Sequence, residues 1–127
     1  MKKIIVAVLM MVGATTAFCQ DWINIADNKD VRLDGRAGTR EFSKTKAGKP
    51  IVVIQGRTFT KNTSAYSYEK WYIAVDDCKA GYGKLVTLTM EGEYKFENDT
   101  VLKGGSMASA ISDVLCYPVL EQEKKGI

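Results

Sequence analysis

The segment YSYEKWYIAVDDC, residues 66–78, decides the predicted fold of this 127-residue chain. All but its last two residues form a run rich in aromatic and β-branched side chains, which favours a β-strand. Successive side chains of a strand point to opposite faces, so Trp71, Ile73 and Val75 share one face. That face is apolar and is expected to pack against a second layer. Cys78 follows directly and closes the predicted strand.

Other segments around this strand also have the composition of strands. The strongest is 51–59, which is rich in β-branched residues. Asp34-Gly35 is a dipeptide typical of tight turns, and 36–50 is predicted to be a loop or an irregular sheet edge. The strand at 66–76 and the two that follow it are expected to form an antiparallel meander. The remaining predicted strands are 22–25, 31–35, 84–91 and 93–97.

The period of the apolar residues changes after Ser106. Apolar side chains then recur at helical spacing, which gives one stripe that can pack on the sheet. Ser106 is predicted to cap the helix N-terminus, and Pro118 is predicted to end the helix just beyond Tyr117. The predicted fold is therefore α+β, a small antiparallel sheet with one C-terminal helix packed on a face. The stripe consists of Met107, Ala110, Ile111, Val114 and Leu115.

Residues 1–19 have the layout of a secretory signal peptide: basic residues, then a short apolar run, then small residues. The apolar run is too short to span a membrane. Cleavage is expected after Cys19, with cleavage after Ala17 as the alternative. The mature chain is then predicted to be a single domain over 20–118, followed by a charged flexible tail over 119–127. Its location would be the periplasm or the outer surface of a Gram-negative bacterium.

Export determines how the cysteines are interpreted. An exported chain meets an oxidising compartment, where two thiols usually form a structural crosslink. Cys78 and Cys116 are therefore predicted to be a disulfide that joins the end of the strand to the end of the helix. The chain-entropy estimate for a loop of this length is about 4 kcal/mol. Cleavage after Ala17 would leave Cys19 as an unpaired thiol.

The composition argues against several classes of chemistry. The chain has no histidine, which removes the commonest general base and metal ligand. Loss of residues 1–19 takes away Lys2 and Lys3 and lowers the formal charge from +3 to about +1. The basic residues of the first half are interspersed with acidic ones and lack the interleaved aromatics of nucleic-acid-binding surfaces. We therefore predict no catalytic residues, no metal, no cofactor and no nucleic-acid partner.

Tyrosines are the strongest sign of a binding surface. Tyr side chains that lie on the sheet face without the helix could form an exposed aromatic platform, a composition favoured at protein interfaces. The candidates are Tyr66, Tyr68, Tyr72, Tyr82 and Tyr94.

Three short motifs carry a resemblance to a known family. They are Asp21-Trp22-Ile23-Asn24-Ile25 after the signal, Asp77-Cys78 after the central strand, and Leu115-Cys116 at the helix end. Over residues 21–116 the chain resembles the surface-adhesin protein E-like domains of Gram-negative bacteria. The resemblance implies surface or periplasmic placement and, for the members that gave the family its name, binding of host matrix proteins. Val31-Arg32-Leu33-Asp34-Gly35 stands where an Asp-x-x-Ser segment is expected.

The expected function is that of an exported, non-catalytic binding protein, adhesin E-like, that recognises another protein. The alternative is a periplasmic inhibitor or immunity-type protein that neutralises a toxin or an enzyme. Small exported disulfide domains suit both roles.

Overall fold

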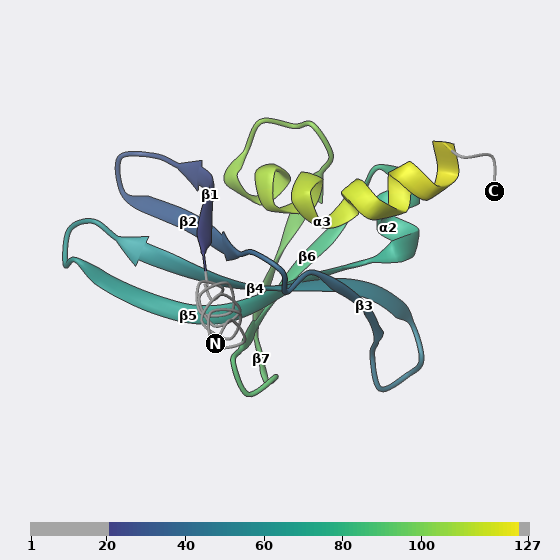
Figure 1. Cartoon of the computed structure of the whole chain (residues 1–127), viewed down its shortest axis with the longest axis horizontal. Helices are drawn as coiled ribbons and strands as arrows, with labels where there is room; N and C mark the ends of the chain where they lie inside the picture. The colour runs from purple at the N-terminus through teal and green to yellow at the C-terminus, as the bar shows by residue number, and fades with distance from the viewer. Residues whose placement is uncertain (1–20, 125–127) are drawn as a thin grey trace, which may run out of the picture.

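The computed structural model describes residues 21–124, which form one seven-stranded antiparallel sheet and two helices (Figure 1). The strand order is β1-β2-β4-β5-β6-β7, and β3 also pairs with β4. The predicted α+β fold is confirmed, whereas the predicted signal peptide lies outside the described residues. The elements are β1 (Trp22–Asp27), β2 (Val31–Arg36), β3 (Glu41–Lys44), β4 (Pro50–Thr60), β5 (Ala65–Ala74), α2 (Val75–Ala80), β6 (Tyr82–Thr89), β7 (Tyr94–Val101) and α3 (Met107–Lys124).

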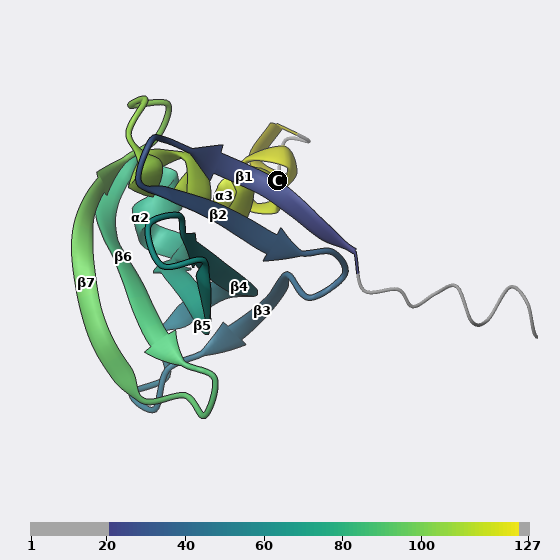
Figure 2. The ribbon, with the colours of Figure 1, turned by 90° about the vertical axis from the view of Figure 1, so that its left-hand side faces the viewer.

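Helix α3 covers one face of a strongly curved sheet (Figure 2). Trp71 and Ile73 of β5 are buried on this face, as their alternation predicts. Gly56 of β4 lies against Trp71, and a Cβ at this glycine would stand only 2.2 Å from the indole ring. The missing side chain therefore lets the largest core residue lie close against β4. The core also contains Val52, Ile54, Leu85, Ile111, Leu115 and Val119.

The first half of the chain is more regular than predicted. Asp34-Gly35 is not a turn: both residues are buried within β2, where Gly35 pairs with Ile23 on one side and Gly56 on the other. A Cβ at Gly35 would stand 2.8 Å from Cδ1 of Ile25, so a larger residue here would have to displace the end of that side chain. The predicted irregular edge contains β3, which pairs with the first half of β4. The second half of β4 pairs with β2.

The central strand is shorter than predicted because β5 ends at Ala74. Residues Val75–Ala80 form helix α2, so Cys78 lies in a helix and does not close a strand. Asp76 and Asp77 stand in the first turn, where carboxylates interact favourably with the helix dipole. The helix ends at Ala80 and is capped by Gly81, which has a left-handed backbone and whose N–H donates a hydrogen bond of 2.9 Å to the carbonyl oxygen of Asp77.

Helix α3 begins as predicted and ends later. The Ser106 hydroxyl accepts a hydrogen bond of 3.0 Å from the backbone N–H of Ser109, which is the predicted cap. The prediction that Pro118 ends the helix is wrong, because the helix continues to Lys124. Val119 is buried in the core, so residues 119–124 of the predicted tail belong to the helix.

The last two strands differ from the prediction only in their bounds. β6 begins two residues earlier than the predicted 84–91, and β7 extends to Val101 instead of stopping at 97. The predicted meander of β5, β6 and β7 is confirmed, since each strand pairs antiparallel with the next.

The predicted disulfide is present and joins the two helices. Cys78 of α2 and Cys116 of α3 are bonded, with their Cα atoms 5.4 Å apart. Both residues are fully buried. Within residues 21–124, no helix is long and apolar enough to cross a membrane.

Candidate binding surface

The face of the sheet opposite α3 gathers aromatic and arginine side chains from four strands. Directly paired residues of an antiparallel sheet point to the same face. Arg57 of β4 pairs with Asp34 of β2 on one side and with Tyr68 of β5 on the other. The hairpins β1–β2 and β4–β5 thus lie side by side (Figure 1). We call the resulting patch the aromatic–arginine surface; it consists of Trp22, Arg32, Arg57, Phe59, Tyr66 and Tyr68.

Arg57 is the centre of this surface. Its guanidinium carbon lies 4.4 Å from the ring centroid of Trp22 and 4.4 Å from that of Tyr66, so the cation contacts two aromatic rings. Its Nε–H donates a hydrogen bond of 2.9 Å to a carboxylate oxygen of Asp34. Desolvation lowers the pKa of Arg57, but hydrogen bonds to Asp34 and Tyr68 together with the charge interactions with Tyr66 and Asp34 outweigh it, and the pKa rises above its ordinary value. The guanidinium is therefore held charged and in a fixed position.

Asp34 is the carboxylate beneath the arginines, and only 3% of its surface is exposed. Its second oxygen lies 3.5 Å from Nε of Arg32 and accepts a hydrogen bond of 3.3 Å from the amide of Asn24. A buried carboxylate requires this degree of compensation. Because two guanidiniums share one carboxylate, the aromatic–arginine surface keeps an excess of positive charge. Arg36 adds to it at the edge, 5.7 Å from the ring centroid of Trp22.

The exposed part of the surface is aromatic. Tyr66 and Tyr68 are 41% and 48% exposed, and their stacked rings have centroids 6.1 Å apart. Trp22 contacts Tyr68 with a centroid separation of 5.9 Å. Arg32 donates a hydrogen bond of 3.1 Å to the Tyr66 hydroxyl and lies 4.9 Å from the Phe59 ring centroid. These contacts hold the tyrosines in place before any partner arrives.

The five predicted tyrosines share one face but do not form one platform. Strand register and alternation place all of them opposite α3. Among the five as residues 21–124 show them, the ring pair that stacks is Tyr66 and Tyr68. Tyr72 is half-buried, and its pKa is raised above the ordinary value. The main cause is burial, and the nearby charge of Glu97 and the side chain of Tyr94 add to it. Tyr82 is the first residue of β6, close to α2, and pairs there with Val101 of β7.

Sequence reasoning missed Trp22, Arg32 and Arg57. One signal was available, because Arg57 and Phe59 alternate on the same face of a strongly predicted strand. The pairing of that face with Asp34 was hidden, since Asp34-Gly35 was interpreted as a turn.

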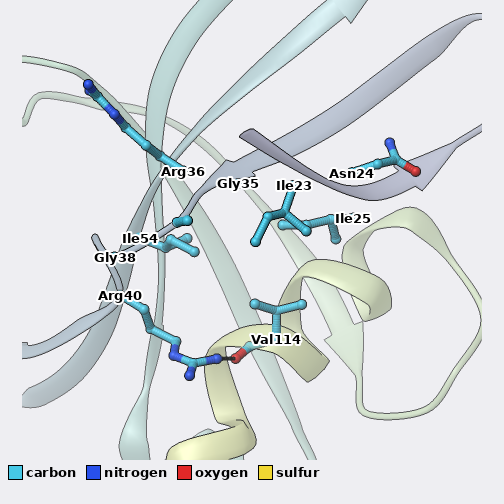
Figure 3. Close-up of a pocket in the computed structure, with 10 residues that line it drawn as sticks. Ile23, Asn24, Ile25, Gly35, Arg36, Gly38, Arg40, Ile54 and Val114 are labelled. Carbon is cyan, nitrogen blue, oxygen red and sulfur yellow. Dashed lines mark hydrogen bonds between the residues drawn. The ribbon is translucent and has the colours of Figure 1, made fainter. Parts of the chain in front are cut away.

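The opposite side of the β1–β2 hairpin lines an open groove of about 400 Å³ (Figure 3). Its walls are the apolar side chains of Ile23, Ile25, Ile54 and Val114. Arg40 reaches across to Val114 and donates a hydrogen bond of 2.8 Å to its backbone carbonyl. Since this guanidinium is bound by the chain itself, we assign no ligand to the groove.

Possible metal-ligating side chains do not cluster in the part of the chain that the structure covers. Residues 21–124 contain no group of three or more His, Cys, Asp or Glu side chains that could hold a metal ion. A scan against protein-family models, a search of curated proteins and a search of solved structures each found no match. The resemblance to adhesin E-like domains therefore stays a prediction.

Proposed function

We propose that this chain is an exported, non-catalytic binding protein whose aromatic–arginine surface contacts a protein partner. The observation that carries the proposal is the guanidinium of Arg57, fixed between Trp22 and Tyr66 and anchored on buried Asp34. Trp, Tyr and Arg are the residues most enriched at the energetic centres of protein interfaces. Here all three types meet on one exposed sheet face.

Rigidity supports this function. Ordering side chains at an interface costs about 0.5–1.5 kcal/mol for each one immobilised. Arg57 and Tyr66 are already held by ring contacts and hydrogen bonds, so this cost falls on folding and not on binding. A guanidinium has five N–H donors, and Arg57 uses its Nε–H on Asp34 and a further donor on Tyr68. The other donors can serve a partner.

The charge of the surface indicates the chemistry of the partner. Arg32 and Arg57 outnumber the single carboxylate of Asp34. A partner that presents Asp or Glu beside apolar side chains would match both the excess charge and the aromatic rings. Such an association should weaken as the salt concentration rises.

The location is part of the proposal. The buried Cys78–Cys116 disulfide supports export to an oxidising compartment. Together with the expected signal peptide, it supports the periplasm or the outer surface of a Gram-negative bacterium as the site of action.

The test is a pull-down with the mature, oxidised protein, read by mass spectrometry, followed by affinity measurement with the partner found. Tyr68→Ala should weaken binding at least tenfold. Tyr82→Ala is the matched control, because Tyr82 is an exposed tyrosine on the same face outside the aromatic–arginine surface. Equal binding by wild type and Tyr68→Ala, or equal loss in both variants, would overturn the proposal.

Protease treatment of intact cells, combined with the identity of the captured partner, separates the two expected roles. An adhesin should be accessible to protease on intact cells and should capture a host matrix protein. An inhibitor or immunity-type protein should be protected within the cell envelope and should capture a bacterial enzyme or toxin.

A further inference from the structure

A second cavity lies on the α3 face, on the other side of the sheet from the aromatic–arginine surface. It is open to solvent and has a volume of about 230 Å³, between the N-terminal half of α3 and strands β2, β4, β5, β6 and β7. Most of its wall is apolar, including Leu33, Leu85 and Ile111. One charged residue, Glu69 of β5, lines the cavity. The cavity therefore combines an apolar wall with a single carboxylate.

The carboxylate of Glu69 is almost fully buried, with 5% of the residue exposed. One of its oxygens, Oε2, accepts hydrogen bonds from the Thr58 hydroxyl at 2.9 Å and from the Trp71 indole N–H at 3.0 Å. Both of these donors are neutral. They fix the orientation of the carboxylate but do not neutralise its charge.

The charge of Glu69 is only loosely compensated. The ammonium of Lys95 lies 3.4 Å from the other oxygen, Oε1, and the Lys95 side chain is 34% exposed. A charge-assisted N–H···O bond is ordinarily about 2.7–2.9 Å long. A buried carboxylate is stabilised by a close cation and is costly without one. The Lys95 ammonium thus stands farther from Oε1 than in an ordinary charge-assisted hydrogen bond.

We infer that this cavity binds an alkylammonium group, with the ammonium on Oε1 of Glu69 and the alkyl stem along the apolar wall. Lys95 occupies the position of that ammonium when no ligand is bound. The ring of Phe96, 47% exposed, also lines the cavity and offers a further contact for the cation. A single carboxylate in an apolar cavity suits an organic cation better than a metal ion, which prefers several oxygen ligands.

The ammonium can come from a free alkylamine or from a lysine side chain of another protein. These two sources share one chemistry, and two probes distinguish them. The first is n-butylammonium chloride, and the second is Nα-acetyl-lysine amide. Binding of both probes indicates that the cavity accepts a lysine side chain, whereas binding of n-butylammonium alone restricts the site to free amines.

Trp71 provides a direct readout, because its indole N–H is bonded to Glu69. The chain has two tryptophans, so a Trp22→Phe variant assigns the two indole signals in an NMR titration of the oxidised protein. We expect saturable shifts of the Trp71 indole signal with n-butylammonium at constant ionic strength. Neutral 1-butanol or NaCl producing the same shifts would overturn the inference.

Two variants test the role of the charge. Glu69→Gln should weaken n-butylammonium binding at least tenfold, whereas Glu97→Gln, an exposed carboxylate on the other sheet face, should not change it. Lys95→Met removes the competing ammonium and should tighten binding at least threefold. Equal binding by Glu69→Gln and wild type, or unchanged or weaker binding by Lys95→Met, would contradict the inference.

A third variant keeps the test decisive if Glu69→Gln does not fold. Ala108 is half-buried on α3 and lines the cavity, so Ala108→Phe fills the space without removing the carboxylate. This variant should lose n-butylammonium binding and keep its disulfide. Wild-type affinity in a folded Ala108→Phe protein would place the ligand elsewhere and overturn the inference. Because the aromatic–arginine surface is on the other sheet face, the Tyr68→Ala test remains independent.

Discussion

Arg40 shows how a single side chain lets a helix continue past a proline. Pro118 has no backbone N–H, so the carbonyl four residues earlier, that of Val114, loses its helical partner. Arg40 donates a hydrogen bond of 2.8 Å to that same carbonyl. Its guanidinium also lies 5.9 Å from the ring centroid of Tyr117. A residue from the loop between β2 and β3 therefore completes α3 from outside, which the local sequence around Pro118 does not reveal.

This pairing predicts a coupling between two distant positions. Arg40→Ala should lower the free energy of unfolding by about 1 kcal/mol, because a helix carbonyl loses its donor in a partly exposed place. In a Pro118→Ala background the backbone N–H is restored, so the same change should cost much less. Urea unfolding of the wild type, the two single variants and the double variant measures the coupling. An equal cost of Arg40→Ala in both backgrounds would show that the hydrogen bond does not replace the missing N–H.

At the scale of elements, patterns that depend on near neighbours were predictable, and patterns set by pairing partners were not. The alternation that buries Trp71 and Ile73, the helical stripe after Ser106 and the disulfide were all predicted from sequence and found in the structure. The Asp34-Gly35 dipeptide was misread because its conformation is set by Arg57 and Gly56, more than twenty residues away. The aromatic–arginine surface depends on the same register, which explains why only its tyrosines were foreseen.

The close approach of Gly56 in β4 to Trp71 in the neighbouring strand β5 supplies an element-scale prediction. Gly35 and Gly56 pair across β2 and β4, and Gly56 lies directly against the ring of Trp71. Gly56→Ala would force the indole away from β4 and should destabilise the protein by about 1–3 kcal/mol, the usual range for an overfilled core. Thermal unfolding measures the change. Gln55→Ala, on the other face of the same strand, is the control and should shift the melting temperature far less. Equal shifts in melting temperature in the two variants would show that the contact with Trp71 is not the reason why a side chain at position 56 destabilises the protein.

At the scale of the whole molecule, the disulfide and the aromatic–arginine surface lie at different ends of the sheet. The disulfide joins α2 to α3, and the aromatic–arginine surface lies on β1, β2, β4 and β5. In Figure 1 the tips of hairpins β1–β2 and β4–β5 lie on one side and α2 on the other. The crosslink and the surface that we propose for binding are therefore separated in space, so the disulfide can hold the core without restricting that surface.

The disulfide closes a loop with a sequence separation of 38 residues. Cross-linking a loop of this size removes denatured-state entropy worth about 4 kcal/mol, which is a large part of the stability of a small domain. In a domain of this size each kcal/mol corresponds to about 4–8 °C in melting temperature. We therefore expect Cys116→Ser to melt at least about 15 °C below the oxidised wild type, with fast proteolysis at 37 °C. Reduction of the wild type should lower its melting temperature to a similar value. Equal melting temperatures of Cys116→Ser and the wild type without reductant would show that packing of α3 on the sheet alone holds the molecule together.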